Sequence, residues 1–282
     1  MGELLGVTVD PGPIRSELRE PVIDASLAGG AARLAANRTH AILRADGIGT
    51  FEVAEGRRVS FEPQAGADER AVAMWLYGTV AALLLAQRGE FALHASVVDV
   101  DGRGLAISGP RRVGKSTTAL RLMQLGHALV TDDVSPLRTS SRLTVHPYAR
   151  PVYVLTETAR ALGLDVSEAR PVLAGHPKLA LHAAAHDPIE LSAIAVVEPS
   201  ADARTVAVRP AGGAEAHWSV LRNTYRASLL RELWQTQLFG WAADVARKVP
   251  VHVVTRPAET WSVDAVAETL VRLALSGSRS AP

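Results

Sequence analysis

The segment Gly109–Ser116, which reads GPRRVGKS, constrains the fold of this chain more than any other feature. It matches the pattern G-x-x-x-x-G-K-[ST] in full. The apolar run Leu105–Ser108 before it predicts a strand, and a helix is predicted over Lys115–Leu125. A loop that turns from a strand into a helix directs successive backbone N–H groups inward, where they can surround phosphate oxygens. The pattern therefore predicts an α/β core with a nucleotide phosphate site, but it does not identify the reaction.

The residue types in this loop have separate physical reasons. Gly109 and Gly114 allow backbone angles and a close approach that a side chain would block. Lys115 can reach the terminal phosphates, and the Ser116 hydroxyl can bind Mg²⁺. The helix N-terminus also favours an anion. The predicted nucleotide-binding residues are Gly109, Pro110, Arg111, Arg112, Val113, Gly114, Lys115, Ser116 and Thr117.

Two adjacent carboxylates, Asp132 and Asp133, follow the next predicted strand, His127–Thr131. Beside a triphosphate, one could bind the metal and the other could accept the proton of an attacking hydroxyl. The alternative is a solvated turn or a helix cap. His94 lies on a predicted β-hairpin, Phe91–Val100 with Leu105–Ser108, and is either a site residue or a buried core histidine.

These motifs together resemble the catalytic core of HPr kinase/phosphorylase. In that family a histidine-bearing hairpin, a P-loop, a Gly-His turn like Gly126-His127 and an Asp-Asp pair follow in this order; the likeness is close over Phe91–Leu137. It implies an HPr kinase-like fold related to phosphoenolpyruvate carboxykinase, with ATP, Mg²⁺ and serine phosphorylation. It further implies that Asp132 is the base and that Asp133 lies near the metal. Lys115 and Ser116 would be phosphate and metal ligands, and His94 a further site residue.

The chain departs from the family at Arg111-Arg112, where a small residue and a glycine are usual. Its N-terminal region does not resemble the family's sensor domain. The layout is more similar to short HPr kinase-like proteins of peptide-modifying systems, such as lasso-peptide precursor kinases, whose acceptor is a serine near the precursor's C-terminus. Phosphorylase activity is correspondingly not expected. Lys178 and Arg226 are candidate substrate contacts, with a solvated lysine and a solvated helix face as the alternatives.

Two other functions stay open at this stage. A small-molecule kinase would use the same site with a metabolite hydroxyl as acceptor. A nucleotide-binding switch or scaffold with little catalysis is kept open by Arg111-Arg112, because an altered loop could bind nucleotide without presenting its γ-phosphate.

His182 and His186 have i, i+4 spacing, but a zinc site would need Asp187 or His176 as a third ligand.

The composition limits the classes of partner and of metal site that we expect for this chain. Hydrophobic residues make up 48% and charged residues 21%, and 30 basic residues balance 29 acidic ones. This balance gives no drive toward nucleic acid or membranes. The chain has no cysteine, which excludes disulfides and thiolate metal sites. The N-terminus shows no signal peptide, and the apolar stretch Ala71–Ala86 predicts a buried helix. We expect a cytoplasmic protein, and the family resemblance further implies that the chain can self-associate.

The domain organisation is predicted as a β-rich module over residues 1–68 and a P-loop catalytic domain over residues 69–282. Pro63–Asp68 has a loop composition, and Glu69–Gln87 has the pattern of a long helix with Gly89 as its cap. The pattern beyond the carboxylates predicts strands at Leu143–Val145, Val152–Leu155 and Val251–Thr255, a loop at Ala169–Pro188, a hairpin made of Ile194–Glu198 and Val206–Val208, and helices at Ser228–Lys248 and Val263–Leu275.

Overall fold

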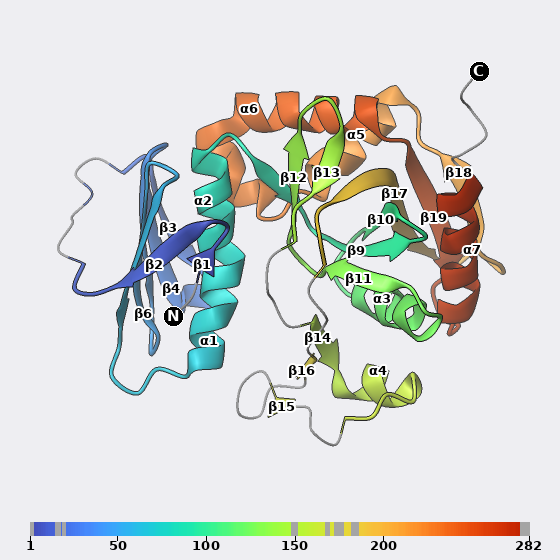
Figure 1. The fold of residues 1–282 in the computed structure, drawn as a ribbon, viewed down its shortest axis with the longest axis horizontal. Coiled ribbons are helices and arrows are strands. Elements are labelled where there is room, and N and C mark those ends of the chain that lie inside the picture. Colours follow the sequence, from blue (N-terminus) through green and yellow to red (C-terminus); the bar gives the residue numbers. More distant parts are fainter. Residues whose placement is uncertain are drawn as a thin grey trace. The chain divides into compact units, whose positions relative to one another are not determined.

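The computed structural model describes residues 3–14, 18, 21–147, 152–166, 170–171, 178–181 and 186–276. It is a mixed α/β structure, as predicted, and it divides into two compact units (Figure 1). One unit comprises Met1–Phe91 and Arg226–Phe239, and the other comprises Ala92–Tyr225 and Gly240–Pro282. The helical segment that follows residue 68 packs on the N-terminal sheet within the first unit, and the predicted domain boundary at residue 68 stays a prediction.

The first unit contains one seven-stranded sheet in the order β1-β2-β7-β6-β5-β4-β3. Its neighbouring strands are antiparallel except for the parallel pair β2 and β7. Phe51 and Phe61 stack at 4.4 Å between ring centroids and are fully buried. The strands are β1 (Glu3–Leu4), β2 (Val7–Pro11), β3 (Ile23–Leu27), β4 (Ala32–Ala36), β5 (His40–Ala45), β6 (Gly49–Ala54) and β7 (Arg58–Pro63).

A long helical segment packs against this sheet. It consists of α1 (Glu69–Trp75), a π-helical turn (Leu76–Val80) and α2 (Ala81–Gln87). The Gln87 side chain accepts a hydrogen bond from the Gly56 N–H and donates one to the Val53 carbonyl, which fastens the helix to the sheet. The segment is long and apolar enough to cross a membrane, but 67% of its most apolar window is buried, as in a core helix. The predicted buried helix is therefore present.

The second unit is built on a nine-stranded sheet in the order β11-β9-β10-β17-β13-β12-β8, with β19 joining β17 to β18. β10, β17 and β19 run parallel, and β9 pairs antiparallel with β10 in the predicted hairpin. The predicted first strand Phe91–Val100 is interrupted, however: His94 lies in a bend between two strands, and Phe91–Leu93 neighbours β12 instead of β10. The strands are β8 (Phe91–Leu93), β9 (Ala95–Val100), β10 (Arg103–Ser108), β11 (Ala128–Thr131), β12 (Ser135–Thr139), β13 (Leu143–Val145), β17 (Ile189–Ser200), β18 (Ala207–Pro210) and β19 (Val251–Pro257).

Two helices, α3 (Lys115–Gln124) and α7 (Val263–Ser276), pack side by side on this sheet (Figure 1). Leu105, Leu122 and Leu270 are fully buried in the core between them and the strands. Burial of each such side chain stabilises the fold by about 1.5–3 kcal/mol. The remaining elements of the unit are α4 (Thr156–Ala161), α5 (Gly213–Arg222), the second part of α6 (Ala227–Lys248), and a small sheet of β14 (Val152–Leu155), β16 (Lys178–Leu181) and β15 (Arg170–Pro171).

Two sequence predictions in this unit are wrong. The expected hairpin of Ile194–Glu198 and Val206–Val208 does not form, because β19 lies between β17 and β18 and pairs with both. Two apolar runs separated by turn residues cannot reveal a later strand inserted between them. The expected loop Ala169–Pro188 contains β15 and β16, which pair with each other and with β14 in the small sheet.

Candidate functional site

The loop Gly109–Gly114 connects β10 to α3 in the predicted strand–loop–helix order. Gly109 has φ +136°, and a Cβ atom added there would lie 2.4 Å from the Val197 carbonyl oxygen on β17. Gly114 has φ +101° and precedes the first residue of α3, with open space around it. Space therefore requires glycine at the first position, and backbone conformation favours it at the second.

Lys115 is folded back over this loop. Its side chain is buried, and Nζ donates hydrogen bonds to the carbonyl oxygens of Gly109 (3.0 Å) and Pro110 (3.1 Å). Burial lowers the pKa of the Lys115 ammonium, and the charges of Asp133 and Asp132 oppose that shift. The lysine is thus held at the loop in an environment where a further anion would stabilise its charge.

Asp132 follows β11 and is buried, with 8% of its surface exposed. Its Oδ1 accepts hydrogen bonds from the hydroxyls of Ser96 (2.5 Å) and Ser116 (2.9 Å). Ser96 lies on β9 and is fully buried, whereas Ser116 lies in the first turn of α3. A buried carboxylate is costly unless it is hydrogen-bonded, and these two hydroxyls meet that requirement. The predicted metal ligand Ser116 and the predicted base Asp132 are therefore in direct contact.

Asp133 contacts a different neighbour. Its φ of +68° turns the backbone between the two carboxylates, and its Oδ1 lies 3.4 Å from His94 Nε2. This distance is longer than a good hydrogen bond but within ion-pair range. The Ser108 hydroxyl donates to the His94 carbonyl (3.2 Å), next to the start of the phosphate loop. The structure thus brings the predicted site residue His94 to the second carboxylate.

The oxygen donors at this site fit Mg²⁺. A serine hydroxyl and two carboxylates are the ligands that this hard cation prefers. Within the described ranges, no group of three or more His, Cys, Asp or Glu side chains could hold a metal alone. Mg²⁺ usually keeps waters and binds substrate phosphates besides one or two carboxylates, so a site that the protein completes only in part suits it. Of the histidines considered for zinc, His182 and His176 lie outside the described residues, and His186 Nε2 contacts Asp99 Oδ2 at 3.1 Å.

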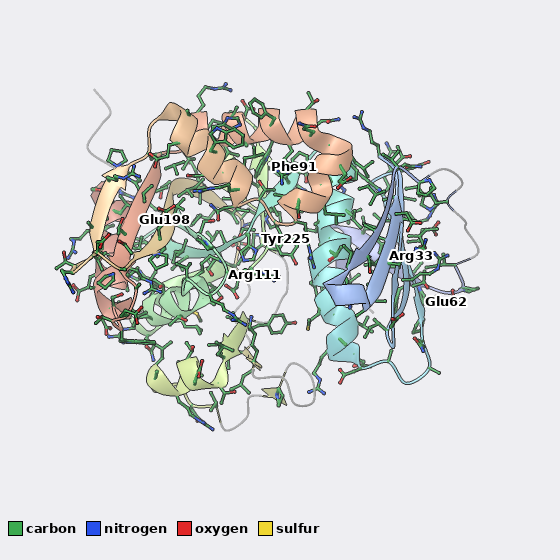
Figure 2. All side chains as sticks on the ribbon, turned by 180° about the vertical axis from the view of Figure 1, so that it is seen from behind. Arg33, Glu62, Phe91, Arg111, Glu198 and Tyr225 are labelled. Carbon is green, nitrogen blue, oxygen red and sulfur yellow. The ribbon has the colours of Figure 1, made fainter. Side chains whose placement is uncertain are left out.

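The basic residues of the prediction are placed differently. Arg111 and Arg112 are exposed on the phosphate loop, and Arg112 has φ +65°; Figure 2 labels Arg111. Lys178 on β16 lies near enough to Lys115 that its charge contributes to lowering the pKa of Lys115. Arg226 belongs to the other unit of the chain, and its role stays a prediction.

Sequence reasoning missed Ser96 and the contact between Tyr225 and His94. Ser96 is a polar side chain at a buried position of an apolar strand, and such a residue usually has a specific hydrogen-bond partner. Tyr225 stacks on the His94 ring at 5.7 Å between centroids. Nothing in the sequence pairs Tyr225 with His94, because the two residues are far apart along the chain.

Comparison with known proteins relates the segment that carries this site to one family. Residues 85–167 match the family model of the HPr Serine kinase C-terminal domain. This segment of the chain is HPr kinase-like. It contains His94, Lys115, Ser116 and the two aspartates, so the predicted resemblance is confirmed where the site residues cluster. The segment is less than a third of the chain, and Lys178, Arg226 and Tyr225 lie outside it.

Individual relatives agree with this match. The HPr kinase/phosphorylase of Clostridium botulinum (strain Eklund 17B / Type B) is 49% identical over 51 residues, which cover 18% of this chain and 17% of that protein. The HPr kinase/phosphorylase of Shouchella clausii (strain KSM-K16) is 40% identical over 73 residues, or 26% of this chain and 24% of that protein. The alignments thus span less than a quarter of these relatives. The solved Hpr(Ser) kinase/phosphatase from Coxiella burnetii aligns over 64% of this chain and 94% of its own, with 19% identity and a TM-score of 0.34.

Proposed function

We propose that this protein is an ATP- and Mg²⁺-dependent kinase that transfers the γ-phosphate to a serine hydroxyl of a peptide or protein. The observation that carries the proposal is the contact between Ser116 and Asp132, with Asp133 and His94 beside it, at the start of the helix that follows the phosphate loop. A loop match alone indicates nucleotide binding. A carboxylate at the Ser116 hydroxyl, followed in the chain by a second carboxylate beside His94, adds the groups that phosphoryl transfer needs.

The loop and Lys115 would hold the nucleotide. Backbone N–H groups of residues 109–117 and the N-terminus of α3 would surround the phosphates. Lys115 would exchange the carbonyl oxygens of Gly109 and Pro110 for phosphate oxygens. Burial lowers the pKa of Lys115, whereas a phosphate beside it would oppose that shift and favour the charged ammonium.

Ser116 and Asp133 are the proposed metal ligands. Asp132 lies next to the proposed metal site because its Oδ1 accepts a hydrogen bond from Ser116. When bound, Mg²⁺ would neutralise charge on the phosphates. Asp132 would accept the proton of the attacking serine hydroxyl. The acceptor oxygen would form its bond to the γ-phosphorus as the bond to the leaving ADP oxygen breaks. The contact with His94 would hold the second carboxylate, that of Asp133, at the same centre.

The proposed acceptor follows from the family resemblance. HPr is the acceptor that the name of the Clostridium botulinum relative, HPr kinase/phosphorylase, gives for that protein. A precursor-peptide serine is the acceptor in the short family members that this chain resembles in layout. Lys178 and Arg226 remain proposed substrate contacts. A cytoplasmic location, self-association, a fold related to phosphoenolpyruvate carboxykinase, and the absence of nucleic-acid and membrane partners belong to the same proposal.

The experiment measures transfer of radiolabelled γ-phosphate from Mg·ATP to serine-ended precursor peptides, to HPr protein and to a set of hydroxyl metabolites. The enzymes are the wild type, Lys115→Met, Asp132→Asn and Asp264→Asn. Asp264 is an exposed carboxylate on α7 that pairs with Arg121, so its variant is a control for charge removal. We expect label on a peptide or protein with the wild type and Asp264→Asn, and none with the other two variants.

Three results would change the assignment. Full transfer by Asp132→Asn would remove that residue from its role. Label on metabolites alone would make the protein a small-molecule kinase. Measured ATP binding without transfer to any acceptor would favour a nucleotide-binding switch. Binding of a non-hydrolysable Mg·ATP analogue, measured by calorimetry, separates loss of the site from loss of the base.

A further inference from the structure

We propose that Tyr225 is a positioning residue that holds the His94 imidazole beside Asp133. This inference rests on the proposed function, because it assigns a role in building the same site. Tyr225 lies at the end of the turn that follows α5, outside the segment that matches the family model. Figure 2 labels its position.

The contact between the two rings is direct. Their centroids are 5.7 Å apart and their planes differ by 24°, an offset stack. Tyr225 is 9% exposed, and the His94 side chain is 22% exposed. The imidazole thus packs on the tyrosine ring while its Nε2 stays within 3.4 Å of Asp133 Oδ1.

The backbone holds the same two segments together. The His94 N–H donates to the Asn223 carbonyl at 2.7 Å, and the Tyr225 N–H donates to the Ala92 carbonyl at 2.8 Å. Between these bonds, Leu93 and Thr224 form an antiparallel bridge. The turn Asn223–Tyr225 therefore pairs with the segment 92–94, which ends at His94 just after β8, and the ring of Tyr225 extends this pairing to the side chains.

This arrangement matters because a histidine side chain has two rotatable bonds. Backbone hydrogen bonds fix the Cα of His94 but leave its ring free to turn. A neighbouring ring restricts the imidazole to orientations parallel to it, which include the one that reaches Asp133. Displacement of a catalytic group by about 1 Å can lower a rate by about 100-fold. Loss of the tyrosine ring should therefore lower turnover without weakening nucleotide binding at the phosphate loop.

The test compares Tyr225→Phe, Tyr225→Leu and Tyr225→Met, each in the wild-type and in the His94→Gln background. Phenylalanine keeps the ring, and methionine fills much of its volume without a flat face. We expect kcat of Tyr225→Phe within about twofold of the wild type, and kcat of the leucine and methionine variants about tenfold or more lower. KM for Mg·ATP should stay within about threefold. In the His94→Gln background, ring removal should change kcat by less than about twofold, because the residue it positions is already absent.

Two results would overturn the inference. One is an equal loss of kcat on ring removal with and without His94, which is the behaviour of a residue that only supports the fold. The other is a Tyr225→Phe variant as impaired as Tyr225→Leu, which would assign the effect to the hydroxyl. Circular dichroism and thermal unfolding of each variant show whether it is folded.

A measurement that needs no activity separates this inference from the proposed function. The His94 ring protons, assigned by their disappearance in His94→Gln, lie in the ring-current field of Tyr225. At fixed pH, their NMR signals should move on Tyr225→Leu and stay nearly unchanged on Tyr225→Phe. Unmoved signals on Tyr225→Leu would exclude the stack. If the signals move but the wild type phosphorylates nothing, the positioning contact stands and the kinase proposal fails.

Discussion

The hydroxyl oxygen of Ser116 lies 2.9 Å from Oδ1 of Asp132, and this contact joins the phosphate loop to the first of the two carboxylates. The hydroxyl of Ser96 reaches the same oxygen at 2.5 Å. One carboxylate oxygen therefore connects β9, the start of α3 and the end of β11. Side chains that share a hydrogen-bond network are not energetically independent, so changes at these three positions should not be additive.

Replacement of Ser96 by alanine removes a buried hydroxyl that donates a hydrogen bond to the buried Asp132 carboxylate. We expect Ser96→Ala to lose about 1–3 kcal/mol of unfolding free energy, because the desolvated oxygen is left with one partner fewer. Phosphoryl transfer should also fall, since Asp132 would be less firmly held. Urea denaturation and the radiolabel assay measure the two effects. Ser192, whose hydroxyl donates to the Gly104 carbonyl, provides the control Ser192→Ala, which should leave transfer unchanged. A Ser96→Ala variant with wild-type stability and transfer would show that the buried hydroxyl is dispensable.

Local patterns predicted the parts of the site that are close in sequence. The glycine pattern at Gly109 and Gly114 gave the turn from β10 into α3, and the helix begins at Lys115 as predicted. Asp132 and Asp133 follow a strand, as their position after an apolar run indicated. These predictions succeeded because the backbone conformation that a glycine allows, and the spacing of apolar residues that indicates a strand or helix, are local properties of a few neighbouring residues.

Contacts between distant segments could not be predicted in the same way. Neither Ser96 nor Tyr225 has a local signal that names its partner, and both partners are set by which strands and turns become neighbours. The insertion of β19 between β17 and β18 has the same cause, because apolar strands of similar composition can pair in several orders. The family resemblance supplied the predicted roles of Asp132 and His94, but not the hydroxyl that contacts one or the ring that stacks on the other.

Replacement of Gly109 by alanine should be more damaging than the same change at Gly126. Both glycines have positive φ, +136° and +97°, where an L-residue is strained by about 1–3 kcal/mol. A Cβ at Gly109 would also lie 2.4 Å from the Val197 carbonyl oxygen, whereas a Cβ at Gly126 has nothing within 4 Å. Gly109→Ala should therefore lose more stability in urea and lose nucleotide binding by calorimetry, while Gly126→Ala keeps binding. Equal losses in the two variants would mean that strain, and not contact with β17, decides the requirement for glycine.

The pH dependence of stability should include a contribution from His252 on β19. Burial lowers the pKa of His252 below its ordinary value of 6.5. Below about pH 6.5 the unfolded chain then binds a proton that the folded chain does not, so unfolding free energy decreases as pH falls toward the folded-state pKa. Between about pH 7 and pH 5, the wild type should lose more stability than His252→Gln. Urea denaturation across this range measures the difference, with His217→Gln on α5 as the control. Parallel curves for the wild type and His252→Gln would contradict the prediction.

Replacement of Arg112 by glycine should separate backbone strain from phosphate binding in the unusual loop. Arg112 has φ +65°, in the left-handed region where a non-glycine residue is strained by about 1–2 kcal/mol. Glycine removes that strain but costs about 0.5–1 kcal/mol in chain entropy, so Arg112→Gly should be as stable as the wild type or slightly more stable. Arg111 is not among the residues with positive φ, so Arg111→Gly has no such strain to relieve and should be destabilised. Urea denaturation of both variants tests these opposite signs, and a destabilised Arg112→Gly would contradict the strain argument.

Calorimetry with Mg·ATP then measures the effect of the same two variants on nucleotide binding, because each variant also removes an exposed guanidinium from the loop. If the arginines contact the phosphates, affinity should fall in both variants, and for Arg112→Gly it should fall without any loss of stability.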